Sequence, residues 1–122
     1  MPAWTNEELT RIGTAHEMRI ASVRRDRSLR KPVIVWMVRL GDDIYTRSVN
    51  GRDAAWFRGT QVRHEGHIQA GGVDKDVTFV DVDDTIDDEL DTAYRRKYGN
   101  AIGVDHIVMP QARAATLKLV PR

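Results

Sequence analysis

Residues 32–49, with the sequence PVIVWMVRLGDDIYTRSV, decide the fold of this chain. The segment 32–40 is apolar and rich in β-branched residues, which predicts a strand that is covered on both faces. Gly41-Asp42-Asp43 has the composition of a tight turn, and 44–49 is typical of a returning strand. We therefore predict an antiparallel hairpin at the centre of the fold.

Further strands are predicted on both sides of this hairpin. Apolar and polar residues alternate over part of 18–23 and over 77–82 and 116–120, and another strand, 67–70, is joined to 77–82 through Gly71-Gly72. Most connections are too short for the crossover helices that parallel strands require. The pattern indicates an α+β domain in which five or six antiparallel strands form a small β-barrel or a strongly curved sheet, with short inserted helices.

Helices are predicted from their end signals. Thr5 and Glu8 have the spacing of a capping box, Asp53 has the side chain of an N-cap, and Gly59 and Gly99 are typical helix stops. The helices predicted from these signals, and from Pro110, span 5–13, 54–58, 84–98 and 110–115. The apolar faces expected on the first and third of them consist of Leu9 and Ile12, and of Ile86, Leu90, Ala93 and Tyr94.

Length and cysteine content limit the class of protein. A chain of 122 residues is typical of one domain, so a single domain spanning 1–122 is predicted. The absence of cysteine excludes disulfides, thiol nucleophiles and thiolate metal sites, and makes the reducing cytoplasm the expected compartment. The first residues lack the pattern of a secretory signal, and the longest apolar run, 32–38, is far shorter than a membrane-spanning helix. We expect a cytoplasmic protein.

The net charge of +1 conceals an uneven distribution of charge. Nine of the 18 acidic residues lie in 73–92, whereas five basic residues lie within 24–31. Acidic side chains at the start of the predicted helix 84–98 stabilise its positive end, and they lack the spacing of a calcium loop. We interpret the acidic cluster as part of a solvated helix, which leaves the basic segment as the candidate anion site.

Motifs of nucleophilic, nucleotide and metal chemistry are missing from the sequence. It contains no Gly-x-Ser-x-Gly elbow, no Gly-x-Gly-x-x-Gly and no Walker A motif. His64 and His67 lack the helical spacing of a metalloprotease site, and in a strand they would point to opposite faces. We interpret them, together with His16 and His106, as surface residues, and predict neither metal ligands nor a catalytic side chain.

The segment 24–59 contains the candidate binding residues. Guanidinium groups suit phosphate or carboxylate, and the basic turn 24–31 is followed by Arg47, Arg52 and Arg58. Short polar groups and exposed backbone are predicted at Ser48, Asn50 and Gly51, and Trp36 and Trp56 have flat faces for a ring. The alternative interpretation is a solvated basic loop beside two core tryptophans.

Two segments carry a resemblance to known families: 30–36, RKPVIVW, and 47–59, RSVNGRDAAWFRG. Over nearly the whole chain, including 64–67 and 71–73, the sequence resembles an uncharacterised bacterial domain family, DUF2255. It also resembles split β-barrel flavin-binding proteins, particularly the deazaflavin-dependent nitroreductase group. In that group a basic turn leads into a Pro-containing strand, and a Ser/Asn-Gly turn precedes a helix bearing Trp. Its Gly-rich Arg/Lys-Ser-Gly turn is replaced here by 27–30, RSLR.

The second resemblance implies an FMN-binding split-barrel fold, FMN or a deazaflavin as cofactor, and a homodimer. It implies an oxidoreductase that transfers hydride to a small organic acceptor, in which the cofactor supplies the chemistry and the protein orients its ring. The cofactor-binding residues that it implies are Arg30, Lys31, Pro32, Val33, Trp36, Arg47, Ser48, Asn50, Gly51 and Trp56.

Two other functions stay open at this point. One is a non-catalytic domain of the same fold that binds an anionic small molecule. The other is a nucleic-acid partner that uses the basic turn 24–31, although the alternating aromatic residues that would support it are missing.

Overall fold

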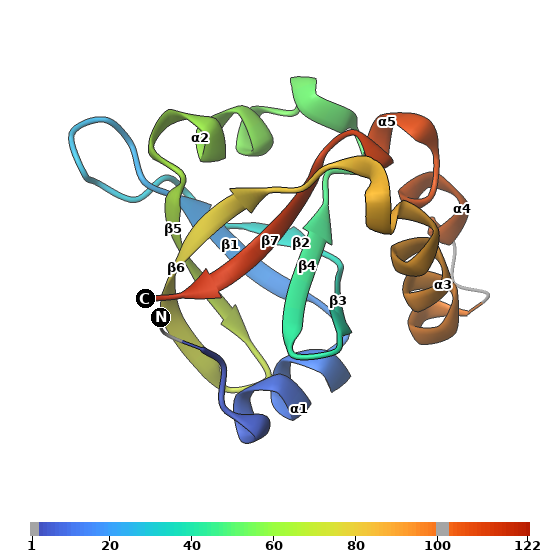
Figure 1. Ribbon diagram of the computed structural model, residues 1–122. Helices are drawn as coiled ribbons and strands as arrows, with labels where there is room; N and C mark the ends of the chain where they lie inside the picture. Colours follow the sequence, from blue (N-terminus) through green and yellow to red (C-terminus); the bar gives the residue numbers. More distant parts are fainter. Residues whose placement is uncertain (1–2, 100–102) are drawn as a thin grey trace.

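The computed structural model describes residues 3–99 and 103–122 (Figure 1). Seven strands form one antiparallel sheet in the order β2-β1-β5-β6-β7-β4-β3. The strands are β1 (Met18–Ser22), β2 (Val33–Val35), β3 (Met37–Leu40), β4 (Asp43–Arg47), β5 (Glu65–Ala70), β6 (Val73–Asp81) and β7 (Thr116–Pro121). The helices are α1 (Asn6–Thr14), α2 (Ala55–Arg63), α3 (Asp87–Tyr98), α4 (Val104–Ile107) and α5 (Pro110–Arg113), with short 3₁₀ turns η1 (Gly51–Asp53) and η2 (Asp84–Ile86).

The sheet closes on itself at Trp36. β2 and β3 stand at opposite ends of the strand order, yet only Trp36 separates them in the chain. The chain pairs with β1 through Val35 and Met18, and two residues later with β4 through Met37 and Thr46. The predicted small antiparallel barrel is thus confirmed. Its strands number seven rather than five or six because the predicted strand 32–40 changes partners at Trp36.

Only the middle of the predicted strand 32–40 is covered on both faces. Met37 belongs to the barrel interior and Val38 to a second apolar cluster outside it, and both are buried. Ile34, in contrast, is 56% exposed, and Arg39 is exposed as well. The prediction of complete cover was wrong because the outer cluster lies over β3 and β4 and does not extend to β2.

Apolar side chains fill the barrel, and α1 lies across one of its ends (Figure 1). The predicted capping box is present, since the backbone N–H of Glu8 donates to Thr5 Oγ1 (3.1 Å) and that of Thr5 to Glu8 Oε1 (2.9 Å). Leu9 and Ile12 are buried against the barrel interior as predicted. Burial of side chains of this size stabilises the fold by roughly 1.5–3 kcal/mol each, so α1 is a structural end cap of the barrel.

A second layer covers the outside of β3 and β4. Leu90 and Tyr94 of α3 are buried there, while the predicted face residues Ile86 and Ala93 are half-buried beside them. α3 is followed at Gly99 by the stop that its sequence predicts. α4, which joins the same cluster through Ile107, was not predicted. None of the helices in the described residues is long and apolar enough to cross a membrane.

The helix predicted at 54–58 differs most from the structure. Asp53 ends η1 and does not cap α2, whose N-cap residue Ala54 makes no side-chain capping bond. Gly59 lies inside α2, which continues to Arg63. A Cβ at Gly59 would stand 2.5 Å from Ser22 Oγ, so glycine serves here for close packing and does not end the helix.

Candidate functional site

Two adjoining cavities lie along β2 and the start of α2, and Trp56 lines both of them. We call the first, of about 250 Å³, the basic cavity; its lining consists of Ile20, Ser22, Arg24, Arg30, Lys31, Val33, Ala55 and Trp56. We call the second, of about 380 Å³, the aromatic cavity; its lining consists of Ile34, Val35, Trp36, Arg47, Val49, Asn50, Trp56, Gly103 and His106.

The turn before the basic cavity is an ordered structure. Arg24 Nη1 donates to the carbonyl of Leu29 (3.2 Å), and the backbone N–H of Arg24 donates to the carbonyl of Ser28 (2.8 Å). Asp26 accepts hydrogen bonds from the Ser28 hydroxyl and backbone N–H, which lower the pKa of this carboxyl. Arg27 has a left-handed φ of 75°. The turn is exposed to solvent, as the alternative interpretation of this segment expects. It is also hydrogen-bonded to itself, and it leads Arg30 and Lys31 to the cavity.

Arg30 lines the basic cavity, and the Nε of its guanidinium lies against Gly59 of α2. Its Nε is buried and has no hydrogen-bond partner in the described part of the chain, although its backbone N–H donates to the Ser22 carbonyl (2.9 Å). Within that part no carboxylate lies within ion-pair distance of Arg30 or Lys31. A buried donor without a partner is costly, so this position fits an anionic group.

The start of α2 adds to the same positive surroundings. Ala55, its first residue, lines the basic cavity, and its first turn has no acidic side chain and no side-chain cap. The first backbone N–H groups of a helix lack acceptors within the helix and carry partial positive charge. Together with Arg30 and Lys31, this helix end suits a phosphate or carboxylate.

The aromatic cavity is bordered by two half-buried tryptophans. Trp36 stacks on Tyr98 with ring centroids 4.1 Å apart, so one face of its indole is covered. Its carbonyl accepts hydrogen bonds from Thr46 Oγ1 (2.7 Å) and Tyr94 Oη (3.1 Å), which fix the position where the strand changes partners. Trp56 meets Phe57 edge to face. Neither tryptophan is wholly a core residue, because each lines a cavity.

Arg47 lines the aromatic cavity, but its guanidinium is engaged by groups of the fold itself. Its side chain is completely buried, with Nη1 2.5 Å from Asp91 Oδ1 and Nη2 3.1 Å from the Asp87 carbonyl. It also donates to the Ile107 carbonyl (3.2 Å) and to Thr116 Oγ1 (3.3 Å). Burial raises the pKa of the Asp87 carboxyl, an effect that nearby Arg47 opposes. The guanidinium thus holds α3 and α4 to the barrel, and its donors are not free for a ligand.

The remaining predicted residues are divided between the cavities and their surroundings. Val33 lines the basic cavity and Asn50 the aromatic one, whereas Pro32, Ser48 and Gly51 line neither. Ser48 is buried with its hydroxyl unpartnered among the described residues. Gly51 packs against Gln111: a Cβ added at Gly51 would lie 3.4 Å from the Gln111 carbonyl oxygen. More of the predicted residues line a cavity on the β2 side than in the 48–51 turn.

Several lining residues were not predicted. Ser22 and Ala55 complete the basic cavity, and His106, predicted as a surface residue, is exposed at the aromatic cavity. The sequence does contain one signal for Ser22. A glycine inside a helix, such as Gly59, often has a packing reason, and here it allows α2 to approach Ser22 closely. Nothing in the local sequence indicates that His106 lies beside Trp36.

The histidines of 64–67 make contacts outside both cavities. His67 Nδ1 lies 2.7 Å from Asp76 Oδ1, and Nε2 contacts Asp74. These carboxylates, Asp76 foremost, raise the pKa of His67. His64, half-buried, lies 3.4 Å from Asp81. Both imidazoles thus contact carboxylates of β6, and neither lines the aromatic cavity.

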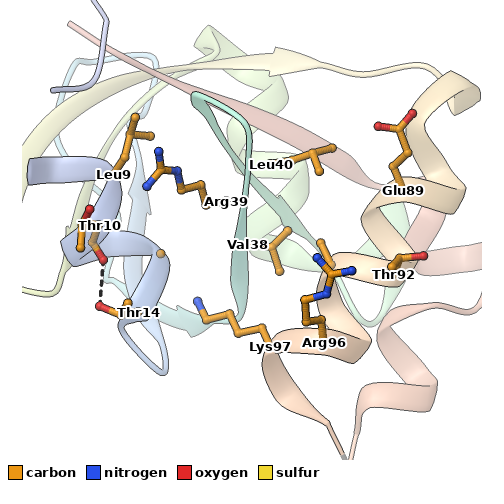
Figure 2. A pocket seen from close by; sticks show the side chains of 12 residues that line it. Leu9, Thr10, Thr14, Val38, Arg39, Leu40, Glu89, Thr92, Arg96 and Lys97 are labelled. Atoms are coloured by element: carbon orange, nitrogen blue, oxygen red, sulfur yellow. Dashed lines mark hydrogen bonds between the residues drawn. The ribbon is translucent and has the colours of Figure 1, made fainter. Parts of the chain in front are cut away.

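A third cavity, larger than the basic and aromatic cavities, lies elsewhere and has no predicted site residue in its lining. Its volume is about 610 Å³, and α1, β3 and α3 surround it (Figure 2).

Comparisons with known proteins place these observations in context. The model of a bacterial family described as "Uncharacterized protein conserved in bacteria" (DUF2255) matches residues 8–119. A sequence search of curated proteins found no match.

Solved structures with similar folds include three cofactor-related proteins. HutZ, the heme storage protein from Vibrio cholerae, superposes with a TM-score of 0.68 at 13% identity, covering 100% of this chain and 92% of that one. An F420 reductase gives 0.57 at 13% identity, with coverage of 93% and 90%. A FAD-binding protein from Mesorhizobium loti gives 0.56 at 14% identity, with coverage of 98% and 91%. At these identities the likeness establishes the split-barrel fold.

Proposed function

The chain belongs to the DUF2255 family, and we propose that it binds a phosphorylated flavin or deazaflavin across the basic and aromatic cavities. The observation that carries the proposal is the unpartnered Arg30 Nε beside Lys31 and the uncapped start of α2, with an aromatic cavity adjoining across Trp56. The fold is shared with proteins that bind FAD, F420 or heme, which supports a planar anionic cofactor.

In this proposal the residues of β2 and its preceding turn hold the phosphate. Arg30 and Lys31 pair with its oxygens, since charge-assisted hydrogen bonds of this kind are strong and directional. Pro32 restricts the preceding residue to an extended conformation, which directs Lys31. Val33 contributes apolar wall between the phosphate and the ring.

The ring system occupies the aromatic cavity in this proposal. Trp36 and Trp56 border it and exclude water, and Asn50 offers a polar contact. Ser48 and Gly51 support the turn that carries Asn50, while Arg47 positions the neighbouring helices and does not bind the cofactor. The bound flavin or deazaflavin would supply hydride transfer to a small organic acceptor. No side chain then has to act as a general acid or base.

Titration of the purified protein tests the proposal. FMN, FAD, F420 and hemin are added separately, and binding is followed by cofactor absorbance and fluorescence. Arg30→Ala and Lys31→Ala are each expected to weaken flavin or deazaflavin binding by about 1–3 kcal/mol. Arg25→Ala is the matched control, because Arg25 is exposed in the same turn and lines neither cavity.

Two outcomes would overturn this assignment. If no flavin or deazaflavin binds at tens of micromolar, the oxidoreductase function is rejected. If hemin alone binds, heme binding becomes the function of this site. If Arg25→Ala and Arg30→Ala weaken binding equally, the phosphate does not lie in the basic cavity. Binding without hydride transfer to any acceptor would identify a non-catalytic binding protein.

Light scattering checks the proposed homodimer, which requires the mass of two chains.

A further inference from the structure

The cavity between α1, β3 and α3 combines an apolar lining with positive charge. Leu9 and Val38 are buried beside it, and Leu40 and Ala93 are half-buried. Its volume of about 610 Å³ falls in the range of small-molecule sites. It shares no residue with the basic or aromatic cavity, so it is a separate candidate site.

Three cations border this cavity against a single carboxylate. Arg39 belongs to β3, Arg96 and Lys97 to α3, and the carboxylate is that of Glu89. In the described residues none of these four side chains takes part in an ion pair. The third basic residue of α3 behaves differently, because Arg95 lies 3.5 Å from Asp105. The cavity therefore has an excess of uncompensated positive charge.

Lys97 is the cation most removed from water. Figure 2 shows its side chain extending from α3 into the space beside β3 and α1. Its ammonium donates to the Met37 carbonyl (2.8 Å), which uses one of its three donor positions. Burial lowers the pKa of Lys97 to about 8. A half-buried ammonium without a carboxylate partner is costly, and a ligand anion would supply the missing charge.

We propose that this cavity binds a small carboxylate with an apolar body, whose carboxylate contacts Lys97 and Arg96 and whose body lies against Leu9, Val38 and Ala93. The excess of positive charge disfavours a metal cation, and it favours a carboxylate over a neutral ligand of the same shape. The apolar lining favours an aliphatic or aromatic carboxylate over inorganic phosphate, which has no apolar surface to bury.

Calorimetric titration with octanoate, against octanamide as a neutral control of the same length, tests the proposal. Octanoate is expected to bind at least tenfold more tightly than octanamide. Lys97→Met and Arg96→Gln are each expected to weaken octanoate binding about tenfold. Arg95→Gln is the control on the same helix. This variant should bind octanoate with the affinity of the parent chain, because Arg95 does not line the cavity.

Methyl NMR provides a second measurement that does not depend on the variants. Octanoate should shift the resonances of Leu9, Val38 and Ala93, and should leave those of Val33 and Val49 at the two other cavities unmoved. Equal binding of octanoate and octanamide, or shifts confined to Val33 and Val49, would overturn the proposal. Failure of the flavin titrations would not affect it, since the two sites share no residue.

Discussion

Arg47 and Arg30 are both arginines beside the barrel wall, but their surroundings differ in one decisive respect. The Arg47 guanidinium is completely buried and meets two carboxylates, two carbonyls and a hydroxyl. Arg30 has a buried Nε with no partner among residues 3–99 and 103–122, and the cavity that it lines has no carboxylate in its described lining. A cation whose donors are all occupied thus stabilises the fold, whereas a cation with a spare donor is available for a ligand. His67 belongs to the first kind and Lys97 to the second.

The largest expected effect comes from removing Arg47. Arg47→Met leaves Asp91 and Asp87 without their buried cation, and loss of one partner of a buried pair costs about 3–5 kcal/mol. Arg30→Met should leave the free energy of unfolding unchanged or slightly higher, because it removes an unsatisfied donor. Urea unfolding measures both. Equal destabilisation by the two substitutions would break the comparison.

The next effect concerns the packing beside Arg30. Gly59→Ala would bring a Cβ to 2.5 Å from Ser22 Oγ and 2.9 Å from Arg30 Nε. The clash should outweigh the higher helix propensity of alanine and destabilise the protein by about 1–3 kcal/mol. Thermal unfolding checks this, and the double variant Ser22→Ala with Gly59→Ala should recover part of the loss. A stabilised Gly59→Ala variant would show that α2 does not need this close approach.

Lys97 gives a pH test of a cation without a counter-charge. Its pKa is lowered by burial from 10.5 to about 8 in the folded protein. Above about pH 8 the unfolded chain therefore binds more protons than the folded one, and this group makes stability rise with pH. The rise should appear between about pH 8 and 9.5, below the range in which tyrosines titrate. Lys97→Met should lack it, and Arg95→Gln should retain it; identical profiles of Lys97→Met and the parent chain would contradict the assignment.

His67 should change the pH dependence of stability in the opposite direction to Lys97, and this effect is the smallest of those predicted. Its pKa is raised above 6.5 by Asp76 and Asp74, so the stabilisation is present below about pH 6.5 and is lost as pH rises through the folded value. The pair is partly exposed, which limits the contribution to about 1 kcal/mol or less. Thermal unfolding of His67→Gln and of His106→Gln as control, at about pH 5.5 and pH 8.5, measures it. A difference between His67→Gln and the parent that grows towards high pH would have the wrong sign.

Local signals predicted much of the fold. The Thr5–Glu8 capping box and the Gly71-Gly72 turn appear as expected, and the hairpin predicted over 32–49 is present in its inner part, 37–47. Each of these features depends on residues close together in the chain. Asp53 and Gly59 misled for the same reason. A residue that fits a local end signal can be required for packing instead, as Gly59 is against Ser22.

The candidate site was predicted only in part. Arg30, Lys31 and Val33 are consecutive or nearly so, and a single turn delivers them to one cavity. Asn50, Trp36 and His106 line one cavity only because the barrel and α4 come together. The third cavity is likewise lined by residues as distant in the chain as Leu9 and Lys97.

The order of strands and turns, the helix at 5–13 and the location of the basic turn follow from the sequence alone, because they depend on propensity, capping and charge over short distances. Tertiary structure alone decided that the strand 32–40 changes partners at Trp36, and which cations are neutralised. Arginine has the same charge wherever it stands, and only the carboxylates, carbonyls and cavities that the fold places around it decide whether it stabilises the protein or awaits a ligand.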